Sequence, residues 1–270
     1  MAGLTIAERI SDADVEAYKR DGVVCLRGLF SRDWTDRMYR AIDRVADSGR
    51  GVNGTKPGNP GKYFSSFDMW RYDEDFRDFA LNSPGPEIAK RLLGQDRVRM
   101  YYDQIFLKEP MTQDPSRWHQ DIPFWPVQGE DIVSIWVTMT DITVECSGLE
   151  YVAGSHLQGE VYGYFTPKES EAETERRTDL PPNYSDPKNR EGVNILSWDM
   201  KAGDCICHHP MTVHGAAGNA SKTQRRLALS VRYMGQDVRY LERPNGLPVA
   251  EGAIPKNGNP FADERFYPAL

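Results

Sequence analysis

The chain has 270 residues, of which 39% are hydrophobic and 27% are charged, and its formal net charge is −7. This balance is typical of globular proteins and excludes disorder throughout the chain. The negative charge is not offset by any local run of Lys and Arg, so nucleic acid is disfavoured as a partner. We find no secretory signal pattern and no apolar run near the ~18 residues of a membrane helix, and therefore expect a cytoplasmic protein with no membrane partner.

Helical patterns and one strand occupy the first third of the chain. Capping residues and apolar residues at helical spacing predict helices over 12–19, 32–47 and 83–94, and a buried strand over 23–26. The segment 49–62 contains five glycines and two prolines, a composition that favours a loop. Its start fits the G-x-G-x-x-G pattern, but a dinucleotide-binding fingerprint follows a strand, whereas this one follows a helix.

Beyond residue 97 the chain changes to short segments rich in Val, Ile, Tyr, Phe and Trp, separated by turns. This texture predicts an antiparallel barrel or double sheet. The polar stretch 168–191 is too charged for a core strand and is interpreted as a mobile excursion or an active-site cover, a role also considered for 49–62. We expect one domain over 1–270, with a helical part over about 12–95 and a sheet core over about 97–235. The predicted strands span 98–108, 132–140, 149–152, 193–197, 204–208 and 226–234.

Three polar residues have the types and order of a metal site. His119 and Asp121 form H-x-D after a predicted strand, and residues two apart on an extended chain point to the same side. His214, in the turn MTVHGAAGN, can supply a third ligand. Two histidines and one carboxylate leave positions open for O2 and an oxo-acid, as in Fe(II) oxygenases. The three residues therefore indicate a catalytic Fe(II) site that uses O2 and an oxo-acid cosubstrate, an interpretation that needs independent support because H-x-D triplets also occur by chance.

An arginine downstream of His214 supports this interpretation. Arg225 lies in a strand-like segment, and its planar fork suits the distal carboxylate of 2-oxoglutarate. Its neighbour Arg226 is the alternative, because strand alternation sends only one of the two side chains inward. We favour Arg225 for its spacing from His214.

Several of these segments resemble the phytanoyl-CoA dioxygenase family: WHQD at 118–121, AGSH at 153–156, HGAAGN at 214–219, and Arg225. The opening YKRDGVVCLRGLF is also similar, so the resemblance runs from about residue 12 to residue 234. It implies a mostly β fold: a double-stranded β-helix, or cupin-like jelly roll, with flanking N-terminal α-helices. It also implies His119, Asp121 and His214 as iron ligands and Arg225 as the cosubstrate anchor. Further residues implied for the 2-oxoglutarate pocket are Lys108, Gln104 and Trp136.

The remaining histidines are interpreted as structural. Cys205, Cys207, His208 and His209 suggest zinc, but adjacent histidines on a strand point to opposite faces, so packing in the core or around the metal ligands is favoured. His156 is expected to be a hydrogen-bonded turn residue. Aromatic residues are proposed to line a substrate pocket, although such residues also commonly form core. These are Tyr102, Phe124, Trp125, Phe64 and Trp70.

The sequence therefore predicts an Fe(II)- and 2-oxoglutarate-dependent dioxygenase that oxidises a small organic substrate and releases succinate and CO2. Hydroxylation is the default outcome, with desaturation, cyclisation and epimerisation as alternatives. Two other readings stay open: a non-enzymatic cupin-like domain that binds a ligand or metal, and a metal-dependent hydrolase or isomerase on the same scaffold. The sequence specifies neither the substrate nor the oligomeric state.

Overall fold

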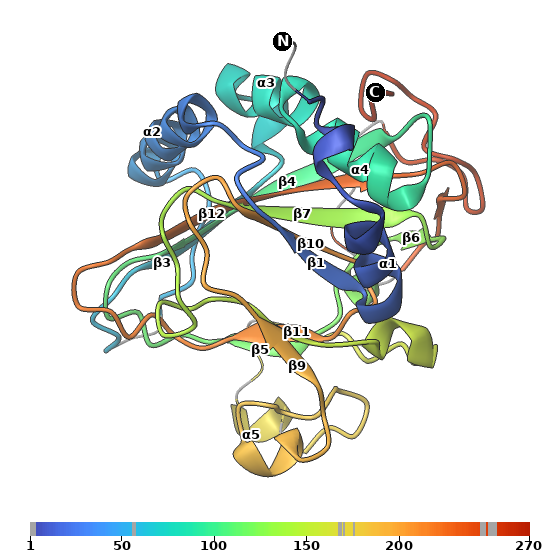
Figure 1. The fold of residues 1–270 in the computed structure, drawn as a ribbon. Helices are drawn as coiled ribbons and strands as arrows, with labels where there is room; N and C mark the ends of the chain where they lie inside the picture. The colour runs from blue at the N-terminus through green and yellow to red at the C-terminus, as the bar shows by residue number, and fades with distance from the viewer. Residues whose placement is uncertain are drawn as a thin grey trace.

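The structure is a computed structural model that describes residues 4–55, 58–166, 169, 171–174, 176–243, 247 and 253–270. Two antiparallel sheets face each other, and four helices cover the outer side of the larger sheet (Figure 1). This arrangement is the predicted jelly roll with flanking helices. It leaves the space between the two sheets as the place where inward-pointing side chains meet.

The larger sheet has seven strands in the order β1-β10-β7-β12-β4-β3-β2, and the smaller has four in the order β5-β11-β8-β9. Neighbours in space are far apart in the chain, so the metal-ligand candidates meet only after the whole core has folded. The larger sheet contains β1 (Val23–Leu26), β2 (Val52–Asn53), β3 (Tyr63–Phe67), β4 (Arg99–Lys108), β7 (Ile132–Thr138), β10 (Cys205–His208) and β12 (Arg226–Met234). The smaller contains β5 (Ser116–His119), β8 (Glu150–Val152), β9 (Ile195–Ser197) and β11 (His214–Ala216), while β6 (Val127–Gln128) pairs with β13 (Arg239–Tyr240).

The helices begin and end at residues with recognisable capping chemistry. Ser11 and Asp14 form a capping box at the start of α1, and Gly22 ends that helix with φ 74°, a left-handed conformation that glycine adopts without steric cost. Ser31 caps α2 by accepting a hydrogen bond from the Trp34 amide. The helices are α1 (Asp12–Asp21), α2 (Arg32–Ser48), α3 (Glu74–Asn82), α4 (Gly85–Leu93) and α5 (Glu171–Thr174), with short 3-10 turns η1 (Ala7–Arg9), η2 (Met69–Arg71), η3 (Ile122–Phe124), η4 (Ser155–Gln158) and η5 (Pro187–Arg190).

The main hydrophobic core lies between the helices and the larger sheet. Alternation along β12 places Leu227, Leu229 and Val231 in this core, together with Met38 and Ile42 of α2. Full burial of such a side chain contributes roughly 1.5–3 kcal/mol each. The apolar helix side of the sheet therefore holds the architecture together, and the other side is free to carry polar residues.

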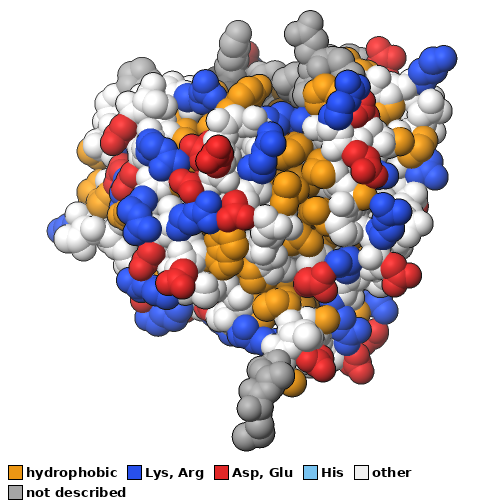
Figure 2. Space-filling view, turned by 90° about the horizontal axis from the view of Figure 1, so that it is seen from above, with side chains coloured by type: hydrophobic (Ala, Val, Ile, Leu, Met, Phe, Trp, Pro, Cys, Tyr) orange, Lys and Arg blue, Asp and Glu red, His pale blue; other side chains and the backbone are white. Residues whose placement is uncertain are grey.

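Charged residues of α2 and α3 form ion pairs on the surface of the helical layer. Arg44 bonds Asp73 at 2.7 Å and Asp75 at 2.8 Å, and Arg37 bonds Asp75 at 2.7 Å. Figure 2 looks onto the molecule from this side and shows acidic and basic side chains interspersed, with hydrophobic groups between them. Exposed pairs of this kind contribute about 0–1 kcal/mol each, so they orient the helices more than they stabilise them.

Most predicted elements are confirmed. The helices expected over 12–19, 32–47 and 83–94 are α1, α2 and α4, and all six strands predicted beyond residue 97 form. The sequence interpretation missed α3 and β3. Among the described residues, no helix is long and apolar enough to cross a bilayer.

The two proposed covers contain some regular structure. The segment 49–62 contains the short strand β2, and its residues 56–57 lie outside the described part. Within 168–191, residues 168, 170 and 175 also lie outside it, and the described remainder packs on the outer face of the smaller sheet, below it in Figure 1. There Tyr184 stacks edge-on against Trp118 at 5.1 Å. Glu169 of the same stretch accepts a 2.9 Å hydrogen bond from Arg117, whose guanidinium lies over the Phe165 ring. A role of this stretch as an active-site cover stays a prediction.

Candidate metal centre

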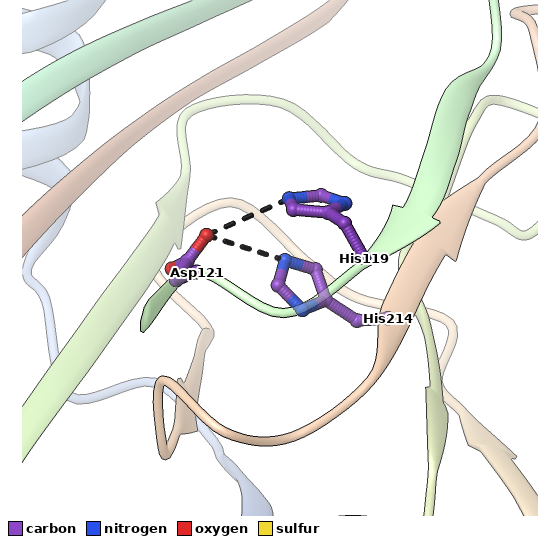
Figure 3. A group of neighbouring side chains, drawn as sticks. All are labelled: His119, Asp121 and His214. Carbon is purple, nitrogen blue, oxygen red and sulfur yellow. Dashed lines mark ion pairs between the residues drawn. The ribbon is translucent and has the colours of Figure 1, made fainter. Parts of the chain in front are cut away.

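His119, Asp121 and His214 come together from three neighbouring pieces of chain (Figure 3). His119 ends β5, and His214 begins β11 directly opposite it in the sheet. Asp121 lies just beyond β5 with helical backbone angles, φ −75° and ψ −35°. The carboxylate therefore reaches the histidines through a turn, and not by alternation along an extended strand as the sequence interpretation assumed.

The three side chains point toward one another and their ligand atoms form a compact group. Nε2 of His119 lies 3.5 Å from Oδ1 of Asp121, and Nε2 of His214 lies 3.9 Å from the same oxygen. One ligand atom from each residue falls within 4.8 Å of the others. Two imidazoles and one carboxylate on one side of an ion match the facial arrangement of non-haem Fe(II) sites.

Backbone carbonyls fix the orientation of both imidazole rings. Nδ1–H of His119 donates to the carbonyl oxygen of Arg117 at 2.6 Å, and Nδ1–H of His214 donates to that of Thr212 at 2.9 Å. These bonds leave the Nε2 lone pairs directed at the ion position. Burial also lowers the pKa of His214 well below its ordinary value. A neutral ring with a free Nε2 lone pair is the form that binds a metal.

The second carboxylate oxygen of Asp121 is held by its own partners. Ser134 Oγ lies 3.2 Å from Oδ2, and Nε2 of His208 lies 3.3 Å from it. Burial alone raises the pKa of Asp121, but the bonds from His119 and His208 outweigh that effect and hold the pKa well below its usual range. The favoured interpretation of His208 as packing around the ligands is confirmed, and its neighbour His209 turns away to Glu130.

A pair of buried cations lies on the interior side of β4 and β12. Lys108 and Arg226 are direct cross-strand partners and are both 1% exposed. Lys108 Nζ donates to Ser147 Oγ at 3.0 Å, and Arg226 donates to the Ser147 carbonyl at 2.9 Å while lying 5.6 Å from the ring centre of Trp136. Among the described residues neither cation forms an ion pair. Two unpaired buried cations side by side make a site for an anion.

Burial lowers the pKa values of both side chains in this pair. It lowers the pKa of Arg226 to about 10, and burial together with the charge of Arg226 holds the pKa of Lys108 well below its ordinary value. A bound carboxylate would offset both effects, because an opposite charge nearby favours the protonated cation.

The comparison with protein families agrees with this geometry, because residues 18–227 match the family described as phytanoyl-CoA dioxygenase (PhyH). The chain belongs to the phytanoyl-CoA dioxygenase family. It is 27% identical over 156 residues to an L-proline trans-4-hydroxylase of Streptomyces griseoviridis, covering 54% of this chain and 58% of that protein. It is 25% identical over 172 residues to a probable alpha-ketoglutarate-dependent hypophosphite dioxygenase of Stutzerimonas stutzeri, covering 63% of this chain and 54% of that protein. The chain thus matches little more than half the length of these two relatives.

Solved structures share the fold of this phytanoyl-CoA dioxygenase family member. The carbocyclase SnoK from nogalamycin biosynthesis, described as a non-haem alpha-ketoglutarate-dependent enzyme, superposes with a TM-score of 0.77 at 24% identity over 100% of both chains. The epimerase SnoN, in complex with Fe3+, alpha-ketoglutarate and nogalamycin RO, gives a TM-score of 0.72 at 24% identity, covering 94% of this chain and 96% of that one. These likenesses confirm the jelly-roll fold.

The predicted position of Arg225 in this family member is wrong. Its guanidinium lies outside the barrel, where it bonds Asp43 at 2.7 Å, Glu109 at 2.5 Å and the Tyr39 hydroxyl at 3.0 Å. The register of β12 sends the next residue, Arg226, inward. The choice of Arg225 follows from its number of residues after His214, but a loop of irregular path separates the two. The residue that points inward is therefore one position further along the chain.

The aromatic candidates separate into two groups. Phe64 and Trp70 lie in the helix-side core, so the prediction that they line the pocket is wrong; Phe64 pairs with Leu107 on β4 and faces away from the interior. Phe124 lies 5.7 Å from the His119 ring. Tyr102 and Trp125 are in the interior and are joined by a 2.7 Å hydrogen bond.

The sequence interpretation missed two aromatic residues near the metal ligands. Phe165 lies 6.0 Å from the His119 ring, and Tyr164 lies 4.8 Å from Phe124. Both follow a segment that Gln120, the residue between the two H-x-D ligands, holds in place: its amide bonds Glu160 and Tyr162 at 2.9 and 3.0 Å. Their signal in the sequence, the aromatic run YGYF, carries no strand or helix periodicity.

Gln104 and Trp136, the other two residues proposed for the cosubstrate pocket, are also inside the barrel. Gln104 Nε2 donates to Ser65 Oγ at 3.3 Å, and its carbonyl accepts from Arg232 at 3.1 Å. Trp136 is 2% exposed and supports Arg226 through its ring face. Of the two, Trp136 lies beside the cation pair, whereas Gln104 contacts a different arginine.

Proposed function

We propose that this chain is an Fe(II)- and 2-oxoglutarate-dependent dioxygenase that oxidises a small organic substrate, with release of succinate and CO2. The observation that carries the proposal is the combination of a facial metal-ligand triad with a buried pair of cations that form no ion pair among the described residues, in the same barrel. The triad alone suits many metal enzymes. The cation pair adds a site for the far carboxylate of a dicarboxylic cosubstrate, which a hydrolase or isomerase does not require.

The chain's own residues have separate tasks in this proposal. His119, Asp121 and His214 would hold the ion, with His208 and Ser134 keeping the Asp121 carboxylate in place. Bound Fe(II) would supply the redox chemistry that couples decarboxylation of 2-oxoglutarate by O2 to oxidation of the substrate.

Arg226 and Lys108 would bind the distal carboxylate of 2-oxoglutarate. Arg226 takes the anchoring role first given to Arg225. Trp136 would keep its guanidinium in position, and Ser147 would orient both cations. Phe124 and Phe165 would exclude water on the His119 side and contact the substrate.

The reaction outcome and substrate class are supported only through relatives. One relative is named for hydroxylation of L-proline and two structural neighbours for carbocyclisation and epimerisation. Hydroxylation remains the default in our proposal. A single domain is also proposed, supported by one hydrophobic cluster that joins residues of α1, α2 and α4 to β7 and β12. A cytoplasmic location stays a prediction.

Anaerobic titration tests the proposal. Fe(II) and 2-oxoglutarate are added to the purified protein, and the weak visible charge-transfer band of their chelate is expected. His214→Ala should give no band. His156→Ala is the control and should retain the band, because the His156 ring bonds the Lys19 carbonyl and none of the metal ligands. A wild-type protein that forms no band and produces no succinate across a screen of small acids, amino-acid derivatives and thioesters would leave the hydrolase, isomerase or binding-domain readings.

A further inference from the structure

Arg232 is a second buried cation on the interior side of β12, near the metal ligands. Its backbone partner on β7 is Ser134, whose hydroxyl lies 3.2 Å from Oδ2 of Asp121. Side chains of directly opposite residues on neighbouring strands share one face of the sheet. Arg232 therefore projects between the two sheets, beside the residue that holds the metal-binding carboxylate.

The guanidinium of Arg232 has unused hydrogen-bond donors. One terminal nitrogen donates to Gln104 Oε1 at 3.1 Å, whereas Nε and the other terminal nitrogen have no partner among the described residues. The group lies 4.3 Å from the ring centre of Tyr102 and 5.6 Å from that of Trp125. Because the residue is only 3% exposed, bulk water does not satisfy the free donors.

No acidic residue in the described part of the chain forms an ion pair with Arg232. The positive charge of Arg232 helps to lower the pKa of Asp121, but both oxygens of that carboxylate have other partners. Its Oδ1 faces His119 and the ion position, and its Oδ2 faces Ser134 and His208. The positive charge thus lacks a dedicated counter-ion, which is costly in a buried site.

The distal carboxylate of 2-oxoglutarate is not the missing anion. Arg232 follows Arg226 by six residues on the same strand, which corresponds to roughly 20 Å of extended chain. The carboxylate bound by Arg226 and Lys108 cannot also reach Arg232. The two cationic positions therefore call for two different anions.

We propose that Arg232 binds a carboxylate of the substrate and thereby selects acidic substrates. This inference rests on the proposed dioxygenase function and names the substrate class for it. The planar guanidinium fork matches the two oxygens of a carboxylate, and the rings of Tyr102 and Trp125 lie against the guanidinium and limit its movement. Gln104 is the positioning residue, because it holds one edge of the fork and leaves the remaining donors free.

The rival explanation is that Arg232 only balances the charge of Asp121. The two explanations differ in what the protein gains from the cation when no ligand is bound. A structural counter-charge stabilises the empty protein, whereas an unpaired binding group destabilises it until the ligand arrives.

The experiment measures melting temperatures of the Fe(II)-loaded protein under anaerobic conditions with saturating 2-oxoglutarate, which occupies Arg226 and Lys108. The probes are benzoate, phenylacetate and cyclohexanecarboxylate, each paired with the carboxamide of the same skeleton. Wild type is compared with Arg232→Gln and with Arg265→Gln, which removes a positive charge from a side chain that is 78% exposed.

At least one carboxylate, at ten times its half-saturating concentration, should raise the melting temperature of wild type and Arg265→Gln by about 3 °C, and its carboxamide should not. In Arg232→Gln this difference should fall by at least half. Equal shifts by carboxylates and carboxamides in wild type, or an undiminished difference in Arg232→Gln, would overturn the proposal.

A ligand-free measurement separates the rival explanation. Arg232→Met should melt at the same temperature as wild type or higher without probe, and a drop of several degrees would show that the cation is structural. The visible band of the chelate reports on the dioxygenase function independently. If the band is normal but carboxylates and carboxamides shift the melting temperature equally, only the assignment of Arg232 is wrong. If the band is absent, the dioxygenase function is contradicted, and the melting temperatures with the probes are then measured on the metal-free protein.

Discussion

The two faces of β12 are both buried, but one carries apolar side chains and the other carries charged ones. Toward the helices the strand presents Leu227, Leu229 and Val231, which join the main core. Toward the smaller sheet it presents Arg226 and Arg232, whose charges lack ion-pair partners among the described residues. Burial of the first set favours folding, and burial of the second opposes it. The difference indicates that stability and chemistry are divided between the faces of a single strand.

The largest effect should follow from removing an interior ligand. His214→Ala is expected to lower succinate formation by more than ~100-fold, since even residues that only support metal ligands typically change activity 10- to 100-fold. The melting temperature should change little, because the ring contributes to the site more than to the apolar core. Assays use a substrate found by the screen, with His156→Ala as a matched control. Retained turnover in His214→Ala would mean that the triad is misassigned.

A substitution on the opposite face should show the reverse pattern. Leu229→Ala removes a fully buried side chain from the helix-side core and should lower the free energy of unfolding by about 2–5 kcal/mol. The KM for 2-oxoglutarate should stay near the wild-type value in protein that remains folded. Urea denaturation and steady-state kinetics at low temperature measure the two quantities. A large KM change with unchanged stability would contradict the division between faces.

Arg225 and Arg226 provide a paired test at one end of the strand. Arg226→Gln should raise the KM for 2-oxoglutarate roughly 10- to 100-fold, because a charge-assisted hydrogen bond contributes about 1.5–3 kcal/mol. Arg225→Gln should leave that KM nearly unchanged, since its partners Asp43 and Glu109 lie outside the barrel. If the two variants behave in the opposite way, the register of β12 is shifted by one residue.

A smaller, pH-dependent effect is expected at Asp103, a buried carboxyl on the helix side of β4. Burial raises its pKa to about 8, although the Trp70 amide donates to it. The folded protein then binds this proton more tightly than the unfolded chain, whose carboxyl has a pKa near ~3.9. This group therefore lowers stability as pH rises toward 8, by at most about 1.4 kcal/mol per pH unit.

Asp103→Asn should remove this dependence while keeping an oxygen for the Trp70 amide. The melting temperature of the variant relative to wild type should increase between pH 6 and pH 8 and level off above pH 8. A difference that is constant over this range would show that Asp103 is ionised throughout.

The sequence was most informative where a pattern has few alternatives. H-x-D followed by a distant histidine predicted the triad, and β-rich texture predicted the sheets. Parity within a strand was less accessible: Arg225 and Arg226 are chemically identical neighbours, and only the cross-strand register separates them. Phe64 was misassigned for the same reason, because an aromatic side chain suits either face of a sheet.

Residues in irregular segments were the hardest to anticipate. Phe165 and Tyr164 reach the site from a stretch with neither strand nor helix periodicity, so no pattern placed them near His119. Arg232 did carry a signal, since it lies an even number of residues from Arg226 on a strand whose register with β7 is continuous. That signal becomes readable only once one of the two arginines is known to face inward.

The clamp made by Gln120 has a consequence for how this protein can diversify. Its amide ties Glu160 and Tyr162 to the very turn that carries His119 and Asp121, while Gln120 itself is buried and also bonds the Met211 carbonyl. Residues 163–166 therefore leave from a fixed anchor next to the reaction centre. We expect that substitutions in residues 163–166 change substrate preference without disturbing the hydrogen bonds that hold the metal-binding turn. This short stretch is therefore a suitable target for directed evolution.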